Sequence, residues 1–131
     1  MHRLLAHTAD LRAELAAPDF AALCAEAVAL VRELLVGTSP VVPSVERRVE
    51  LAGDDEAERF FRFVRELLYL ADAERFLPAA CAVGTGEVTV AGEPFDSARH
   101  RTERQIKALT RHRYLYERDA GGVRAELLFD L

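Results

Sequence analysis

Hydrophobic and polar residues alternate over several short stretches of this chain. Residues 10–15 (Asp-Leu-Arg-Ala-Glu-Leu) alternate strictly, which predicts a half-buried strand with Asp10 at the start of its polar face. Further short apolar stretches predict strands over 2–8, 45–52, 76–83, 87–91, 106–117 and 123–131. Asp-Ala-Gly-Gly at 119–122 predicts a hairpin turn between the last two strands. Residues 92–96, which contain glycine and proline, predict a loop.

Two longer segments carry apolar residues at three- and four-residue steps, which predicts amphipathic helices. The first covers 18–36 and is followed by Gly37, a residue suited to closing a helix. The second covers 55–73, and Asp55 with Glu58 near its start resembles a capping box. Its predicted apolar stripe consists of Phe60, Phe63, Val64, Leu67, Leu68 and Ala71. We interpret the charged flank of the second helix as solvated surface. Strands joined by hairpins, with two helices between them, predict an α+β fold in which antiparallel sheets pack against the helices.

Length and composition indicate one domain spanning residues 1–131. Hydrophobic residues make up 50% and charged residues 30% of the chain, which is typical of a globular protein. No apolar run reaches the roughly 18 residues of a membrane span, and the N-terminus meets polar His7 and Asp10 too soon for a signal peptide. We therefore expect a cytoplasmic protein without membrane contact, in which Cys24 and Cys81 are reduced packing residues.

Positive charge is concentrated in one segment of an acidic chain. The net charge is −5, yet residues 99–118 hold seven basic and two acidic residues, so this segment carries +5 and the remainder −10. The overall acidity argues against a free-standing nucleic-acid-binding protein, which ordinarily carries a basic surplus. Lys107, the only lysine among 17 basic residues, lies in this segment, either by chance or because the site needs a compact ammonium.

Two aspartates lie on the polar faces of predicted strands near the two ends of the chain. Asp10 begins the strand over 10–15, and Asp130 precedes the terminal carboxylate at Leu131. If these strands are neighbours, about 4.8 Å apart, three carboxylates converge, and a shared proton or a cation relieves their repulsion. Such oxygen ligands suit calcium, magnesium or manganese. The alternative is that Asp10 caps a turn and Asp130 is merely solvated.

Other candidate residues give weaker signals. His7, His100 and His112 are candidate ligands or bases, but they lack a metal-binding spacing, and such histidines are more often surface residues or hydrogen-bonded core residues. The sequence contains no Ser/His/Asp constellation, nucleophile elbow, Walker loop, dinucleotide fingerprint or Cys-x-x-Cys pair. Common enzyme motifs therefore give no support for a catalytic function.

Four motifs, in order along the chain, resemble those of the archease family. They are His-Thr-Ala-Asp at 7–10, Gly-Glu-Pro-Phe-Asp at 92–96 followed by Arg99-His100, Ile-Lys-Ala-Leu-Thr-Arg-His at 106–112, and Phe-Asp-Leu at 129–131. The exit of the second helix, Leu-Leu-Tyr-Leu at 67–70, is also similar. The sequence departs from the family pattern at Arg12, where glycine is usual, and at Gln105, where glutamate is common. The resemblance spans essentially the whole chain.

The resemblance implies a fold and a function. Archeases are small α+β proteins, not enzymes, that assist a GTP-dependent RNA ligase of the RtcB type in tRNA splicing and RNA repair. They promote guanylylation of the ligase and so allow multiple turnover. The family carries a divalent metal site, often seen with calcium, and its ligands would map onto Asp10, Asp130 and Leu131.

The resemblance also implies which residues meet the partner. Lys107 and His112 would lie on the segment that reaches towards the ligase active site, and we assign His100 and Arg104 to the same partner-contacting set. RNA or GTP would be contacted only within the complex with the ligase.

Two other functions stay open at this point. A metal-dependent phosphoester hydrolase would hold its ion with Asp10 and Asp130 and use His7 or His100 as a base. A chaperone-like interaction module would bind clients without any metal dependence. The scarcity of acid–base pairs in the sequence argues against the hydrolase.

Overall fold

The structure, a computed structural model, describes residues 1–6 and 10–131. Its elements in chain order are β1 (His2–Ala6), β2 (Asp10–Ala17), α1 (Phe20–Val36), β3 (Val45–Glu50), α2 (Glu56–Glu74), β4 (Phe76–Val83), β5 (Glu87–Pro94), β6 (Ala108–Asp119) and β7 (Gly122–Asp130). The predicted helices and strands are all present. Only β5 extends well beyond its predicted end.

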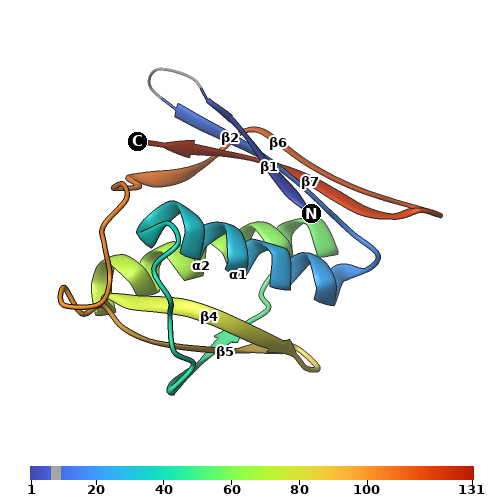
Figure 1. Cartoon of the computed structure of the whole chain (residues 1–131). Coiled ribbons are helices and arrows are strands. Elements are labelled where there is room, and N and C mark those ends of the chain that lie inside the picture. The colour runs from blue at the N-terminus through green and yellow to red at the C-terminus, as the bar shows by residue number, and fades with distance from the viewer. Residues whose placement is uncertain (7–9) are drawn as a thin grey trace.

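Two antiparallel sheets enclose both helices. Strands β1, β2, β7 and β6, in that order, form a four-stranded sheet, and β3, β5 and β4 form a three-stranded one. Figure 1 shows α1 and α2 side by side between the two sheets. The buried apolar residues of all these layers form one cluster, in which each amphipathic element covers the apolar face of another. The predicted α+β class, with sheets packed against two helices, is confirmed.

The helix ends follow from local sequence. The Asp19 carboxylate accepts a hydrogen bond from the Ala22 N–H at 2.8 Å and starts α1, and Gly37, with a φ of +60°, ends it. The Asp55 carboxylate accepts from the Glu58 N–H, also at 2.8 Å, so the predicted cap of α2 is confirmed. Neither helix combines the length and apolar character needed to cross a membrane, within the residues described.

Helix α2 buries a different arc from the predicted stripe. Phe60 and Phe63 are fully buried as expected, but Phe61 is buried as well, because α2 packs against α1, β4 and β6 rather than against a single surface. Leu68 and Ala71, predicted to face the core, are only half-buried. The C-terminal half of α2 therefore keeps part of its apolar side near the surface.

The predicted loop over 92–96 is wrong in its first half, because β5 continues through Pro94. Gly92 pairs with Val45 on one side and Pro78 on the other. A Cβ atom at Gly92 would lie 1.9 Å from the Leu77 carbonyl oxygen. Glycine is needed here because two strands approach each other closely, and not because the chain turns.

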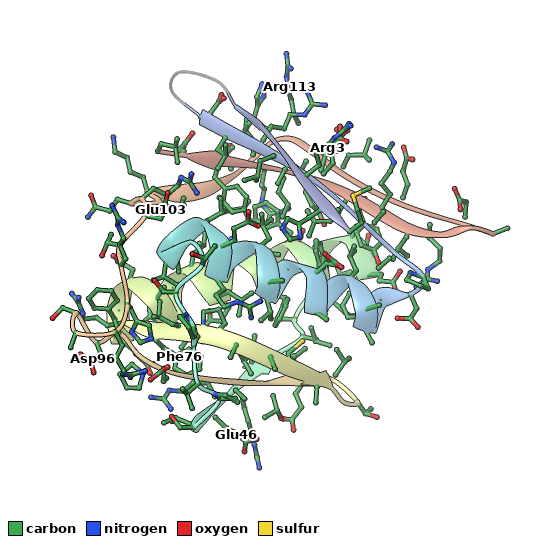
Figure 2. All side chains as sticks on the ribbon, in the orientation of Figure 1. Arg3, Glu46, Phe76, Asp96, Glu103 and Arg113 are labelled. Carbon is green, nitrogen blue, oxygen red and sulfur yellow. The ribbon has the colours of Figure 1, made fainter. Side chains whose placement is uncertain are left out.

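Strand β6 is interrupted in the middle. Thr110 pairs with Leu128 and Leu115 pairs with Glu126, so the four residues 111–114 stand opposite a single residue of β7. Arg113 has a φ of +59° within this bulge. Figure 2 shows the Arg113 side chain on the side of the four-stranded sheet that faces away from the helices. Both cysteines are free, as expected, with Cys24 buried and Cys81 half-buried.

Candidate functional site

Strands β2 and β7 place two aspartates opposite each other. Asp10, the first residue of β2, is the register partner of Asp130, the last residue of β7. The adjacent pair, Leu11 and Phe129, is buried in the core, so the two carboxylates share the opposite face of the sheet. Directly opposed residues have Cβ atoms about 4.5–5.5 Å apart. The two strands are therefore neighbours, which is the arrangement that the predicted convergence of these aspartates requires.

One oxygen of this pair is buried and has no hydrogen-bond partner among the described residues. This oxygen is Oδ1 of Asp10. Arg12, two residues along on the same face, directs its Nη2 to Glu14 and Glu126, each at 3.5 Å. Within the described residues, neither Asp10 nor Asp130 has an ion-pair partner. A buried, unsatisfied carboxylate oxygen is unfavourable unless a cation or a donor reaches it.

Lys107 and Leu131 flank Asp130. The Lys107 N–H donates to the Asp130 carbonyl oxygen at 2.8 Å, and the next residue, Ala108, is the register partner of Asp130 on β6. Leu131 is half-buried and packs against the core, while the Lys107 side chain is exposed. The carboxylate pair and the lone lysine therefore occupy the same end of the four-stranded sheet, the end at which Figure 1 marks the C-terminus.

The donor set fits a hard divalent cation. Two facing carboxylates, one with an oxygen that accepts no hydrogen bond from the described residues, supply the ligand type that calcium, magnesium and manganese prefer. In the part of the chain that the structure describes, no three His, Cys, Asp or Glu side chains form a complete metal site. Among the described residues, main-chain oxygens such as that of Leu131 could supply further ligands, together with water. His7, the candidate ligand or base, lies outside the described residues.

His100, assigned to partner contact, is instead completely buried. Its Nδ1 accepts a hydrogen bond from the Asp96 N–H at 2.8 Å, and its Nε2 lies 3.2 Å from Oε2 of Glu93. Because Nδ1 accepts, the ring proton lies on Nε2 and is donated to Glu93. Direct contact with a partner would require this turn to open. We therefore correct the assignment: His100 holds the turn in place.

Glu93 is the anchor of the same turn. It is a buried carboxylate that pairs with Arg99 and accepts hydrogen bonds from the Val42 N–H and from His100. The Arg99 hydrogen bond, followed by that of Val42, lowers the pKa of Glu93 to about 2. The Gly-Glu-Pro-Phe-Asp…Arg-His motif thus builds a fixed turn and connects β5 to the segment that leads to β6.

Carboxylates of α2 neutralise part of the basic segment 99–118. Arg111 donates to Glu58 at 2.7 and 2.6 Å, and Arg118 donates to Glu56 at 2.9 and 2.6 Å. The basic side chains of this segment without a carboxylate partner in the described structure are Arg101, Arg104, Lys107 and Arg113. The positive surface that a partner can meet is therefore smaller than the sequence suggests.

The two remaining candidate contacts differ in accessibility. His112 lies in the β6 bulge with an exposed side chain, and its N–H donates to Thr110 Oγ1 at 3.1 Å. Arg104 is half-buried and donates to the Leu34 carbonyl oxygen at 3.3 Å. His112 can be reached directly, whereas Arg104 is partly used in holding its segment against α1.

A groove between α2 and the segment 102–109 was missed from the sequence. It consists of two adjoining hollows of about 280 and 480 Å³ that share Leu68, Asp72, Gln105 and Ile106. Lys107 lines the second hollow. The available signal was the long irregular connection between β5 and β6, since long connections in compact domains are often functional.

Comparison with known proteins agrees with this geometry. The sequence model of the Archease protein family matches residues 2–131. Protein archease of Archaeoglobus fulgidus is 28% identical over 135 residues, covering 99% of this chain and 98% of that protein. Protein archease of Pyrococcus furiosus is 30% identical over 102 residues, covering 71% and 72% respectively.

Two solved structures share the fold. The solution structure of Methanobacterium thermoautotrophicum protein 1598 superposes with a TM-score of 0.81 at 25% identity, covering 99% of this chain and 98% of that one. The crystal structure of a Thermotoga maritima protein, named an archease and possible chaperone, gives 0.67 at 22% identity, covering 100% and 98%. With the motifs in register, the aspartates paired and the family match running from residue 2 to residue 131, the chain belongs to the archease family.

Proposed function

We propose that this protein is a non-enzymatic activator of a GTP-dependent RNA ligase of the RtcB type, acting in cytoplasmic tRNA splicing and RNA repair. It would promote guanylylation of the ligase and so permit multiple turnover. Family membership supports this proposal. The observation that carries it is the register pairing of Asp10 with Asp130 beside Lys107, which gathers two carboxylates and one ammonium at one end of a sheet.

A divalent cation is part of this proposal. Asp10, Asp130 and Leu131 would hold it, with calcium as the first expectation and magnesium or manganese as alternatives. The buried Oδ1 of Asp10, which has no partner within residues 1–6 and 10–131, supports this assignment. The bound cation would supply positive charge that orients oxygen atoms of the ligase or its nucleotide. The role of the two aspartates is then to fix its position on a rigid sheet.

Lys107 and His112 would reach the partner from the same end of the molecule. Both are exposed, and the backbone of Lys107 is tied to Asp130. An ammonium is a compact charge that suits a phosphate or carboxylate of the complex. RNA or GTP would therefore be met only once the ligase is bound.

A chaperone-like role is the second candidate, and the Thermotoga relative, named a possible chaperone, favours it. Both readings require a protein partner. They differ in metal dependence, because a chaperone-like module has no need of a cation between Asp10 and Asp130. A phosphoester hydrolase has less support, since His100 serves the buried turn rather than a site beside the aspartates.

Guanylylation assays test the activator directly. Purified RtcB-type ligase from the same organism would be incubated with GTP, and ligase–GMP and ligated RNA would be followed with wild-type protein and with Asp10→Asn, Asp130→Asn and Lys107→Ala. We expect each variant to slow guanylylation at least about tenfold, which corresponds to about 1.4 kcal/mol. Asp54→Asn is the matched control, because Asp54 is exposed and distant in sequence from both strands.

Normal multiple turnover with all three variants would refute the activator proposal. Equal prevention of aggregation of unrelated proteins by wild-type and Asp130→Asn protein, without any effect on the ligase, would favour the chaperone-like role. Turnover of phosphoesters by the pure protein in the presence of divalent ions would favour the hydrolase.

A further inference from the structure

The groove beside α2 combines an apolar floor with a basic rim. The floor is formed by Leu35, Leu68, Leu77, Phe95, Ile106 and Leu109. The rim carries four cations, Arg65, Arg75, Arg104 and Lys107, while Asp72 is the only acidic residue that lines it. A protein with a net charge of −5 thus presents a concentrated positive patch around an apolar channel.

The rim cations are left without internal carboxylate partners. In residues 1–6 and 10–131, none of the four forms an ion pair, although Arg62 and Arg111, nearby on α2 and β6, are both paired with Glu58. Arg75 lies over the Phe95 ring at 4.9 Å, and Arg65 lies 5.8 Å from the Phe61 ring. These contacts hold the guanidinium groups at the rim without neutralising their charge.

An exposed aromatic side chain borders the same groove. Tyr69 is 58% exposed, and Met1 and Val42 are the other large hydrophobic residues exposed on the described surface. It lies one residue from Leu68, which forms part of the floor. Tyrosine and arginine are enriched at the centres of protein interfaces, where they contribute much of the binding energy.

We propose that this groove binds an extended segment of a partner protein in which acidic residues alternate with aliphatic ones. The unpaired cations complement the acidic side chains, and the aliphatic floor complements the apolar ones. Single-stranded RNA is a poorer fit, because bases bind chiefly by stacking on aromatic rings, and the floor is mainly leucine and isoleucine. The groove reaches Lys107, so the bound segment lies next to the Asp10–Asp130 pair.

The identity of the partner rests on the proposed function: there it is the RNA ligase, and the groove is where the ligase docks. Docking and activation are then separate tasks of adjoining surfaces. Groove substitutions weaken association, whereas substitution of Asp10 or Asp130 weakens guanylylation within the complex.

The groove can be tested without the ligase. A short synthetic peptide in which glutamate alternates with leucine would be titrated into isotope-labelled protein, with backbone amide shifts as the readout. We expect saturable shifts confined to α2 and residues 102–109, and binding at least tenfold weaker with Arg65→Glu/Arg75→Glu or with Tyr69→Ala. Arg48→Glu is the matched control, an exposed arginine on β3 outside the groove. Absence of these shifts, equal shifts with a lysine–leucine peptide, or tighter binding of an oligouridylate would overturn the proposal.

The ligase provides a second, separable measurement. Wild-type protein and the same variants would be compared for ligase affinity by interferometry and for guanylylation at saturating protein. We expect Arg65→Glu/Arg75→Glu to raise the Kd at least tenfold while saturating protein restores guanylylation. An unchanged Kd would overturn the groove as the docking site, even if the ligase is activated. A ligase that neither binds nor responds would refute the proposed function and leave the peptide titration to decide on the groove.

Discussion

Arg111 and Glu58 join β6 to α2 through two parallel hydrogen bonds, one from each terminal nitrogen of the guanidinium, at 2.7 and 2.6 Å. The guanidinium carbon also lies 4.2 Å from the centre of the Phe61 ring. This pairing fixes the edge strand that leads into the bulge to the helix beneath it. The hydrogen bonds from Arg111, and then from Arg62, lower the pKa of Glu58 to about 2.

The Glu58 pKa gives a prediction for acid stability. A carboxyl group whose pKa is lowered on folding contributes stability above its ordinary pKa of 4.5, and this contribution is lost as the pH falls through about 2. We expect Glu58→Gln to be less stable than wild type at pH 6 and to show a smaller further loss between pH 4.5 and 2. Urea unfolding across this range measures it, with the exposed Glu50→Gln as control. Identical pH profiles would contradict the prediction.

His2 gives a prediction of the opposite sign. Its Nδ1 lies 3.0 Å from Glu26 and its Nε2 lies 2.7 Å from Glu33. Burial acts to lower the pKa of His2, but the two glutamates outweigh it and raise the pKa above 6.5. The contribution is therefore full below pH 6.5 and is lost as the pH rises through the raised value. We expect wild type to lose more stability than His2→Gln between pH 6 and 9 in denaturant titrations, and equal losses would contradict the prediction.

Gly92 should tolerate no side chain. A methyl group there would lie 1.9 Å from the Leu77 carbonyl oxygen, which is main chain and part of a paired strand. Gly92→Ala should destabilise the protein by about 3 kcal/mol, at the upper end of the range for overpacked sites. Gly84→Ala, whose Cβ would lie at an ordinary 3.6 Å from the Glu87 carbonyl oxygen, should change stability by less than about 0.5 kcal/mol. The unfolding midpoints of both variants, measured by calorimetry, test this difference in stability.

Alanine substitutions of His100 and His112 should affect different properties of the protein. His100→Ala leaves the Asp96 N–H and part of the buried Glu93 carboxylate without a partner, which should cost about 2 kcal/mol of unfolding free energy. His112→Ala should leave stability unchanged, because its side chain is exposed, and should lower ligase activation. A surface role for His100 would be indicated if its alanine variant kept full stability.

Substitution of Asp130 should have opposite effects on stability in the absence and in the presence of calcium. Without metal, Asp130→Asn should raise stability by a few tenths of a kcal/mol, because it removes a like-charge pair directly across two strands. With calcium at a hundred times its Kd, wild type should gain about 2.7 kcal/mol and the variant almost nothing. Thermal unfolding in chelator and in calcium measures both effects, with Asp54→Asn as control. If calcium stabilised Asp130→Asn as much as wild type, Asp130 would be excluded as a calcium ligand.

Periodicity predicted most of the fold because the helices and strands bury continuous apolar faces. Residues 10–15 are the clearest case, where alternation fixed both the strand and the face that carries Asp10. The end of β5 was mispredicted because glycine and proline usually mark turns and loops. Only the position of the neighbouring strand shows why Gly92 is needed. Phe61 was not predicted as core, since the pattern does not show that α2 has neighbours on several sides.

The candidate site was predicted where it depends on strand faces and missed where it depends on tertiary contacts. The Asp10–Asp130 pair follows from alternation in two strands. The burial of His100 depends on a turn closed by Glu93, which lies on another element and is itself buried. The groove depends on how the segment 102–109 runs along α2. No local pattern contains that information.

The central strands of the four-stranded sheet, β2 and β7, pair residues that lie 106 to 120 positions apart in the sequence. A nascent chain cannot form this pair until β7 has left the ribosome, and such distant pairings are slow to form. Any product that stops before residue 122 lacks both a central strand and one of the two aspartates. The register pair of Asp10 and Asp130 therefore forms only after β7 has been synthesised.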